Sequence, residues 1–262
     1  MNFRIAQDAR PQVKALLAAA ALSLALWFIP YAWILSYPFQ LFVTFIHEGG
    51  HALAAVLTGN SVRSLSVSLD TSGLTETLLP QGGGFFSRML ISSAGYVGAI
   101  AFGALLLWLV RKRVKARAVL VGSAVLIAGL TGVFGFLVPL TNFSFSPFTV
   151  VAGALITVGL LAASKYLGPS ARNFLVSFLA VQCVLNALFN LRDLLYLSAA
   201  TDAPTDAKNM EALTGIPSIF WALFWAGVGF VIVTLVLRAY AVSKEAPGSQ
   251  PDLPFEDSPL EV

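Results

Sequence analysis

Long apolar stretches follow one another along this chain, separated by short polar segments. A membrane-spanning helix needs about 20 mainly apolar residues. Seven stretches fit this requirement, at 13–36, 39–59, 85–110, 118–140, 147–163, 171–197 and 216–240. No segment between them is large enough to form a hydrophobic core of its own. We therefore expect an all-α polytopic membrane protein with six or seven transmembrane helices, forming one domain over residues 1–240.

The segment 60–84 has a different pattern. Val62, Leu65, Val67 and Leu69 alternate in part with polar residues, which is typical of a strand with one buried face. A turn sequence at 70–73, a second short apolar stretch at 74–79 and three glycines at 82–84 follow. This predicts a β-hairpin, sheltered by helices because unpaired strand edges are costly in lipid. Residues 241–262, in contrast, combine prolines with carboxylates and predict a disordered tail.

Composition supports a membrane location. Hydrophobic residues make up 57% of the 262 residues and charged residues only 11%, with a mean hydropathy of +0.81. Soluble domains carry about a quarter charged residues. The net charge of +3 comes from Lys and Arg in short runs between apolar stretches, which is typical of topology signals and not of a nucleic-acid surface. The expected surroundings are a lipid bilayer, with no nucleic-acid partner.

The basic runs give two conflicting indications of orientation. The run 111–117 is the strongest cytoplasmic marker. Counting spans forward puts the later basic residues on the same side, namely Lys165, Arg172, Arg238 and Lys244. Counting back through three full spans puts the N-terminus outside, although its own cations indicate inside, namely Arg4, Arg10 and Lys14. Either one of the first three segments does not cross fully, or the N-terminal charges are overridden.

The second apolar stretch carries the sequence His47-Glu48-Gly49-Gly50-His51. Residues four apart share one face of a helix, so both imidazoles can bind one metal ion. In zinc hydrolases with this spacing the ion lowers the pKa of its water, and the glutamate takes the proton and later returns it. Both histidines of the chain lie in this motif, and ionisable groups inside a membrane helix are usually functional. We predict a Zn²⁺ site with His47 and His51 as ligands and Glu48 as the catalytic residue.

Small residues occur within the motif and in the third apolar stretch. Gly49 and Gly50 lower helix propensity, and either close helix packing or room for a substrate strand would explain them. In the third apolar stretch, Ser92, Ser93 and Gly95 favour a close-packing face, and Tyr96 could hydrogen-bond near the site.

A third protein ligand must be a carboxylate, because no other histidine exists. In the stretch 171–197, Gln182, Asn186, Asn190 and Asp193 fall on one helical face. Such a stripe should face protein partners and not lipid, which makes Asp193 the candidate metal ligand and Asn186 and Asn190 candidate substrate-positioning residues. Pairing of Asp193 with Arg192 is disfavoured because adjacent helical residues do not face each other. The alternatives are Asp70, Glu76, Asp202 and Asp206.

The chain resembles the site-two protease family of intramembrane metallopeptidases, particularly its small bacterial M50B-like members. The sequence 45–52 is similar to the family's metal-binding helix, 92–96 to the small-residue motif of its next core helix, and 186–193 to the later helix in which Asn precedes the Asp ligand. The segment 60–84 lies where the family has a hairpin that feeds an extended substrate to the metal. Two departures are Leu194, which stands where the family has Gly, and the absence of the prolines that precede that ligand. There is no room for a PDZ domain.

Two functions follow as hypotheses. The first is a zinc metalloendopeptidase that cleaves membrane proteins or peptides within the bilayer, in the bacterial cytoplasmic membrane as the resemblance implies. The second is a non-proteolytic scaffold or a transporter with a structural or transported metal. Glu48 favours the enzyme, because a structural site needs ligands but no acid–base group beside them.

Overall fold

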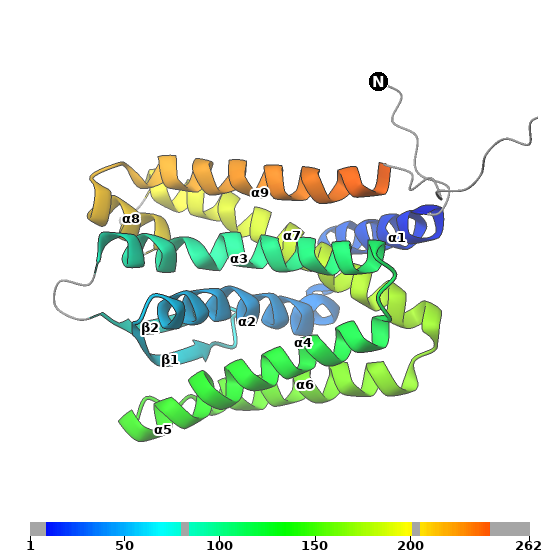
Figure 1. Ribbon diagram of the computed structural model, residues 1–262, viewed down its shortest axis with the longest axis horizontal. Coiled ribbons are helices and arrows are strands. Elements are labelled where there is room, and N and C mark those ends of the chain that lie inside the picture. Colours follow the sequence, from blue (N-terminus) through cyan, green and yellow to red (C-terminus); the bar gives the residue numbers. More distant parts are fainter. Residues whose placement is uncertain (1–8, 80–83, 201–204, 242–262) are drawn as a thin grey trace, which may run out of the picture.

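The computed structural model describes residues 9–79, 84–200 and 205–241 (Figure 1). Its helices are α1 (Arg10–Phe28), α2 (Trp33–Leu57), α3 (Phe85–Arg111), α4 (Ala116–Leu130), α5 (Val138–Asn142), α6 (Pro147–Tyr166), α7 (Pro169–Ala200), α8 (Asp206–Thr214) and α9 (Ser218–Ala241), its strands are β1 (Ser61–Val67) and β2 (Gly73–Leu78), and a π-helical stretch η2 (Thr131–Leu137) joins α4 to α5. The predicted tail lies outside the described residues, apart from Ala241.

Among the described residues, five helical segments are long and apolar enough to cross a membrane: α3, the continuous run Ala116–Asn142, α6, and the segments Pro169–Tyr196 and Ser218–Tyr240 of α7 and α9. They coincide with the last five predicted spans and lie along a common axis (Figure 1). The expectation of a mostly helical integral membrane protein with one small hairpin is confirmed.

The boundary between the first two helices was predicted in the wrong place. The sequence suggested a break between residues 36 and 39, whereas the chain turns at 29–32 and Pro38 lies inside α2. Tyr31 adopts a left-handed conformation at this turn, with φ of 65°. Pro38 is only the sixth residue of α2, so its missing N–H removes a single hydrogen bond near the helix start.

The two N-terminal helices together carry the chain once along the bundle. The side-chain amide of Gln12 donates to the carbonyl of Val110 at 3.2 Å, which places the start of α1 beside the end of α3. At the other end of the bundle, His51 of α2 bonds to Ile91 near the start of α3. Counted as one crossing, α1 and α2 put Arg10 and Lys14 at the same end as the basic run 111–117, which resolves the conflict in the sequence.

Helix α2 is packed closely among its neighbours. A Cβ at Gly49 would lie 2.4 Å from Leu130 of α4, and one at Gly50 would lie 2.3 Å from the carbonyl oxygen of Ala94 in α3. The Leu130 side chain could shift to admit a methyl group at Gly49, but the backbone oxygen of Ala94 leaves no room for one at Gly50. Of the two explanations that the sequence left open for these glycines, close helix packing is the one that the structure supports.

The hairpin is present as predicted, in a two-stranded antiparallel sheet. Its register pairs Leu65 with Thr75 and Val67 with Gly73, and an irregularity lies between Val62 and Ser64. The irregularity explains the partial alternation: Val62, Leu65 and Val67 are all buried although the first two are three residues apart. Leu69, which the pattern counted as inward-facing, is 72% exposed.

The two edges of the hairpin differ. On β1, the backbone N–H of Val67 donates to the hydroxyl of Thr149 at 2.9 Å, and this hydroxyl lies 3.2 Å from the Val67 carbonyl, to which it donates. The amide of Asn142 donates to the carbonyl of Arg63 at 3.0 Å. Helices α5 and α6 therefore cover the outer edge of β1, whereas residues of β2 line the cavity described below.

Candidate metal centre

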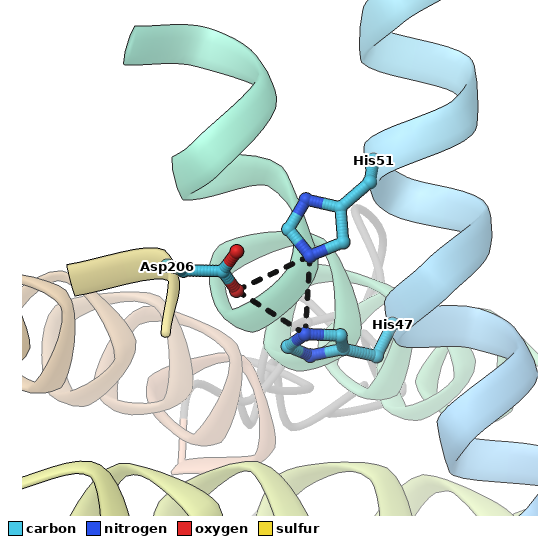
Figure 2. Close-up of side chains that lie close together, drawn as sticks. All are labelled: His47, His51 and Asp206. Carbon is cyan, nitrogen blue, oxygen red and sulfur yellow. Dashed lines mark hydrogen bonds and ion pairs between the residues drawn. The ribbon is translucent and has the colours of Figure 1, made fainter. Parts of the chain in front are cut away.

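His47 and His51 lie one turn apart on α2 and point to the same side (Figure 2). The ring Nδ1 of His51 lies 2.6 Å from the carbonyl oxygen of Ile91 in α3. A carbonyl can only accept, so Nδ1 carries a proton and Nε2 is the ring atom left to bind a metal ion. The Nε2 atoms of the two histidines are 3.2 Å apart. This is the arrangement of a metal-binding pair with an oriented ring.

The carboxylate that joins them is Asp206, the first residue of α8. Its Oδ2 lies 3.5 Å from His47 Nε2 and 3.2 Å from His51 Nε2 (Figure 2). Thr205 caps the helix by accepting from the backbone N–H of Lys208 at 3.2 Å, which fixes the direction in which Asp206 leaves the backbone. Burial acts to raise the pKa of Asp206, but the charge on His51 and hydrogen bonds from both histidines outweigh it and hold this pKa below its ordinary value.

The three atoms have the spacing of a tetrahedral metal site. Ligand atoms held about 2.0–2.2 Å from a tetrahedral ion lie about 3.3–3.6 Å from one another. The observed separations are 3.2, 3.2 and 3.5 Å. His47, His51 and Asp206 are the one such group among the described residues that could hold a metal ion. Three protein ligands would leave a fourth position open, as in catalytic zinc sites.

Gly95 of α3 makes room for the two imidazoles. A Cβ built on it would lie 2.4 Å from the Nε2 atoms of both histidines. Any larger residue would enter the space between the ligand atoms. The sequence singled out Gly95 only as part of a packing face, whereas the structure places it against the metal-binding atoms.

Glu48 is buried and held by the hairpin. The hydroxyl of Thr75 lies 2.7 Å from Glu48 Oε2 and 3.0 Å from the Glu48 carbonyl, as a donor to both. Gly73 lies against the other oxygen, since a Cβ there would be 2.6 Å from Glu48 Oε1. One turn earlier, the hydroxyl of Thr44 donates to the carbonyl of Thr71 at 2.7 Å. The sequence offered no reason to assign functions to Thr44, Gly73 or Thr75, because their roles depend on how β2 docks on α2.

A cavity of about 800 Å³ opens at this centre. His47, Glu48, His51 and Asp206 line it, together with residues of β2 and of the first turns of α3. Tyr96 also lines it, in edge-to-face contact with the His47 ring at 4.7 Å and stacked on Trp225 of α9. The structure thus places Tyr96 at the site through ring contacts with His47 and Trp225.

Asp193 does not join the histidines, so the ligand set predicted from the sequence needs correction. Its Oδ1 accepts from Arg192 at 2.6 and 2.9 Å, and its side chain is 57% exposed. The expectation that neighbouring helical residues would not pair was wrong here, because the long arginine side chain folds back along the helix. Asp206, one of the alternatives, takes the place assigned to Asp193.

The polar stripe from which Asp193 was predicted forms hydrogen bonds within α7 itself. The side-chain amide of Asn186 donates to the side-chain oxygen of Gln182 at 2.9 Å and to its carbonyl at 3.0 Å. Neither Asn186 nor Asn190 lines the cavity at the metal centre, and Asn190 is exposed. A stripe with internal partners needs none from another helix, which is why it was a poor guide to the third ligand.

The remaining carboxylate candidates lie elsewhere. Glu76 pairs with Arg63 across the hairpin at 3.7 Å. Asp70 accepts from the backbone and hydroxyl of Ser72 at the hairpin turn, and these bonds lower its pKa. Asp202 lies outside the described residues. Only one signal in the sequence could have favoured Asp206: Thr205 before it is a good helix cap.

Comparison with known proteins gives one match. The model of the Peptidase M50B-like family matches residues 16–236. The matched segment contains both histidines, Glu48 and Asp206. No curated protein and no solved structure matches the chain significantly.

Proposed function

The chain belongs to the M50B-like peptidase family, and on that premise we propose that it is a zinc-dependent intramembrane endopeptidase that hydrolyses peptide bonds of membrane-associated substrates. The observation that carries the proposal is the triangle of His47, His51 and Asp206, whose edges suit a tetrahedral ion, with Glu48 beside it. The peptidase family and the five apolar spans support a membrane protease. Zinc, the endopeptidase reaction and the kind of substrate are our proposals.

Two histidines and one carboxylate form the ligand set in this proposal. A Zn²⁺ ion held by such a set supplies Lewis acidity, which lowers the pKa of water and polarises a substrate carbonyl. His51 is oriented through Ile91, and Gly95 leaves the ligand atoms free to converge. Asp206 arrives from a separate helix, so folding of α8 onto α2 and α3 completes the set.

Glu48 acts as the general base and then as the general acid. The Thr75 hydroxyl occupies Oε2, so Oε1, beside Gly73, is the atom available to take a proton from the attacking water. The same oxygen then returns the proton to the amide nitrogen of the leaving strand. Thr75 is a positioning residue, because its hydroxyl fixes the rotamer of Glu48 and also ties the hairpin to the site.

The hairpin offers a way to present an extended substrate. Residues Gly73, Leu74, Thr75, Thr77 and Leu79 of β2 and its end line the cavity. A helical peptide bond is shielded by its own hydrogen bonds, so a membrane substrate must unwind locally and find other partners. The edge of β2 could supply backbone hydrogen bonds by strand addition.

The location follows from the distribution of charge. Most described cations lie at the end of the bundle away from the metal centre: at the start of α1, after α3, at the end of α6, at the start of α7 and at the end of α9. By the positive-inside rule that end faces the cytoplasm, which places the centre nearer the other face of the membrane. The resemblance to small bacterial members supports the bacterial cytoplasmic membrane.

The test is the substitution Glu48→Gln in the full chain. Wild type and variant are purified and assayed for zinc content, and membrane fractions of cells producing each are compared by terminal-peptide proteomics. We expect both proteins to hold one zinc ion per chain, while peptide termini produced by the wild type disappear with the variant. Glu76→Gln, an exposed carboxylate of the same hairpin, is the matched control and should cleave normally. Equal cleavage by Glu48→Gln and wild type would refute a proteolytic role and favour a structural or transported metal.

A further inference from the structure

A second cavity lies at the opposite end of the bundle from the metal centre, with a volume of about 450 Å³. The start of α1, the end of α3, the loop into α4 and the start of α7 enclose it. In Figure 1 this is the end where α1 lies beside the last turns of α3. None of the residues with a role at the metal centre lines it.

All the ionisable residues that line this cavity are cations: Arg113, Lys115, Arg117 and Arg172. They come from the loop after α3, from α4 and from α7, so no single basic run accounts for them. The described carboxylates all belong to the other end of the bundle, in the hairpin, α2 near the metal centre, the end of α7, and α8. No carboxylate among the described residues therefore pairs with Lys115, Arg117 or Arg172.

Arg172, Lys115 and Arg117 keep N–H groups with which a ligand can form hydrogen bonds. Arg172 donates one bond to the carbonyl of Ser164 at 3.3 Å, which uses a single N–H of its guanidinium. The structure shows no ion pair between a described carboxylate and Lys115 or Arg117, and both are exposed. Two long, unconstrained cations and one anchored guanidinium thus converge on the same space.

The rest of the lining is mainly apolar, with Gln12, Asn173 and Ser177 as its polar members. Ala15 of α1, Val110 of α3 and Val114 of the loop line it beside the cations. Close by, the Lys112 ammonium lies 5.4 Å from the centroid of the Trp108 ring, and tryptophan is enriched where membrane helices reach the headgroups. The cavity therefore combines a positive rim with an apolar wall at the depth of the headgroup layer.

We infer that this cavity binds the phosphate headgroup of an anionic membrane phospholipid. Basic pockets between transmembrane helices on the cytoplasmic side suit such headgroups, and each Lys or Arg near the surface contributes about 1 kcal/mol of attraction. The apolar wall favours a lipid over a free phosphate, because it can cover the glycerol and the first acyl carbons. The proposal is independent of the proteolytic activity.

The alternative explanation is that these cations serve only as signals of membrane orientation. Such signals need not line a common cavity, and other cations at the same end of the bundle provide a matched control. Lys165 and Arg238 are exposed cations at the same end of the bundle, and neither lines the cavity. The double variant Lys115→Gln/Arg117→Gln removes two charges from the cavity. Lys165→Gln/Arg238→Gln removes two charges from the same end without touching it.

The experiment is native mass spectrometry of the full-length protein in detergent, titrated with phosphatidylglycerol or with phosphatidylcholine of the same acyl chains. We expect wild type to retain one phosphatidylglycerol molecule at least tenfold more strongly than phosphatidylcholine. The cavity variant should lose about thirtyfold in phosphatidylglycerol affinity, as removal of two such cations implies, and the control variant should stay within about twofold. Melting temperature, measured in the same detergent, shows that both variants are folded.

Four results would overturn the inference. Equal retention of the two lipids by wild type would remove the selectivity, and equal losses in both variants would indicate a general charge effect. Displacement of the lipid by an equal concentration of glycerol phosphate would point to a free phosphate as the ligand. Displacement by a synthetic peptide of residues 242–262, which are rich in carboxylates, would assign the cavity to the chain's own C-terminal segment.

Discussion

Two polar regions of the bundle, the metal centre and the stripe on α7, differ in where their hydrogen bonds go. At the metal centre, His47 and His51 point away from their own helix toward a carboxylate on another. Along α7, Gln182 and Asn186 bond to each other one turn apart. The first set is incomplete until separate helices meet, whereas the second is complete within one helix.

The difference teaches how to interpret polar residues in membrane helices. A polar side chain in lipid needs a partner, but the partner can be four residues away on the same helix. Residues on a shared helical face therefore do not establish a site. Convergence of ligand atoms from different elements, with lone pairs left over, is a stronger indication.

The largest expected effect is on zinc affinity, and it distinguishes Asp206 at the metal centre from Asp193 on α7. Asp206→Ala removes an atom of the ligand triangle and should weaken zinc binding more than about 100-fold, beyond the 10- to 100-fold typical of residues that only support a ligand. Asp193→Ala removes a side chain paired with Arg192 and should leave affinity within about twofold. Zinc competition with a chelator measures both, with His47→Ala/His51→Ala as the background. Loss of zinc in Asp193→Ala with retention in Asp206→Ala would return the ligand role to Asp193.

A smaller effect is expected from Gly95→Ala. The added methyl group would lie 2.4 Å from both Nε2 atoms, so at least one imidazole must move and zinc affinity should fall about 10- to 100-fold. The matched control is Gly98→Ala on the same helix, whose Cβ would meet only Gly50 Cα at 3.6 Å. Alanine is the better helix former, so neither variant should melt lower in the absence of metal. If both variants bind zinc like wild type, Gly95 has no role in shaping the centre.

The smallest effect concerns the stripe on α7. Asn186→Leu leaves the buried Gln182 without its donor and should lower the free energy of unfolding by about 1 kcal/mol. Gln182→Leu/Asn186→Leu removes both partners and should recover most of that loss. Thermal unfolding in detergent measures stability, and the zinc assay should show no change. Loss of zinc in Asn186→Leu at unchanged stability would make the stripe part of the metal centre.

Features set by local periodicity could be predicted from the sequence. The 3.6-residue repeat places His47 and His51 on one face, and apolar length identifies the last five spans. Partial alternation, a turn sequence and a second apolar stretch located the hairpin, whose strands run over 61–67 and 73–78. Each of these depends on residues within a few positions of one another.

Features set by packing between distant segments could not. Asp206 reaches the histidines only because α8 returns to the start of α3 after the whole of α7, and its local sequence differs little from that around Asp202. Thr75 meets Glu48 through a register shifted by the irregularity near Val62. The break between the first two helices could lie at 29–32 or near Pro38. Its position depends on how α1 and α2 pack on α7.

The hydroxyl of Thr149 binds both backbone groups of Val67 on β1, and this affects whether copies of the chain can join through their hairpins. Two-stranded sheets with two free edges can add strands indefinitely and join copies edge to edge. With the edge of β1 covered, a further strand can join this hairpin only at β2, whose residues line the cavity. The fold thereby confines strand pairing to the side of the hairpin that faces the metal centre.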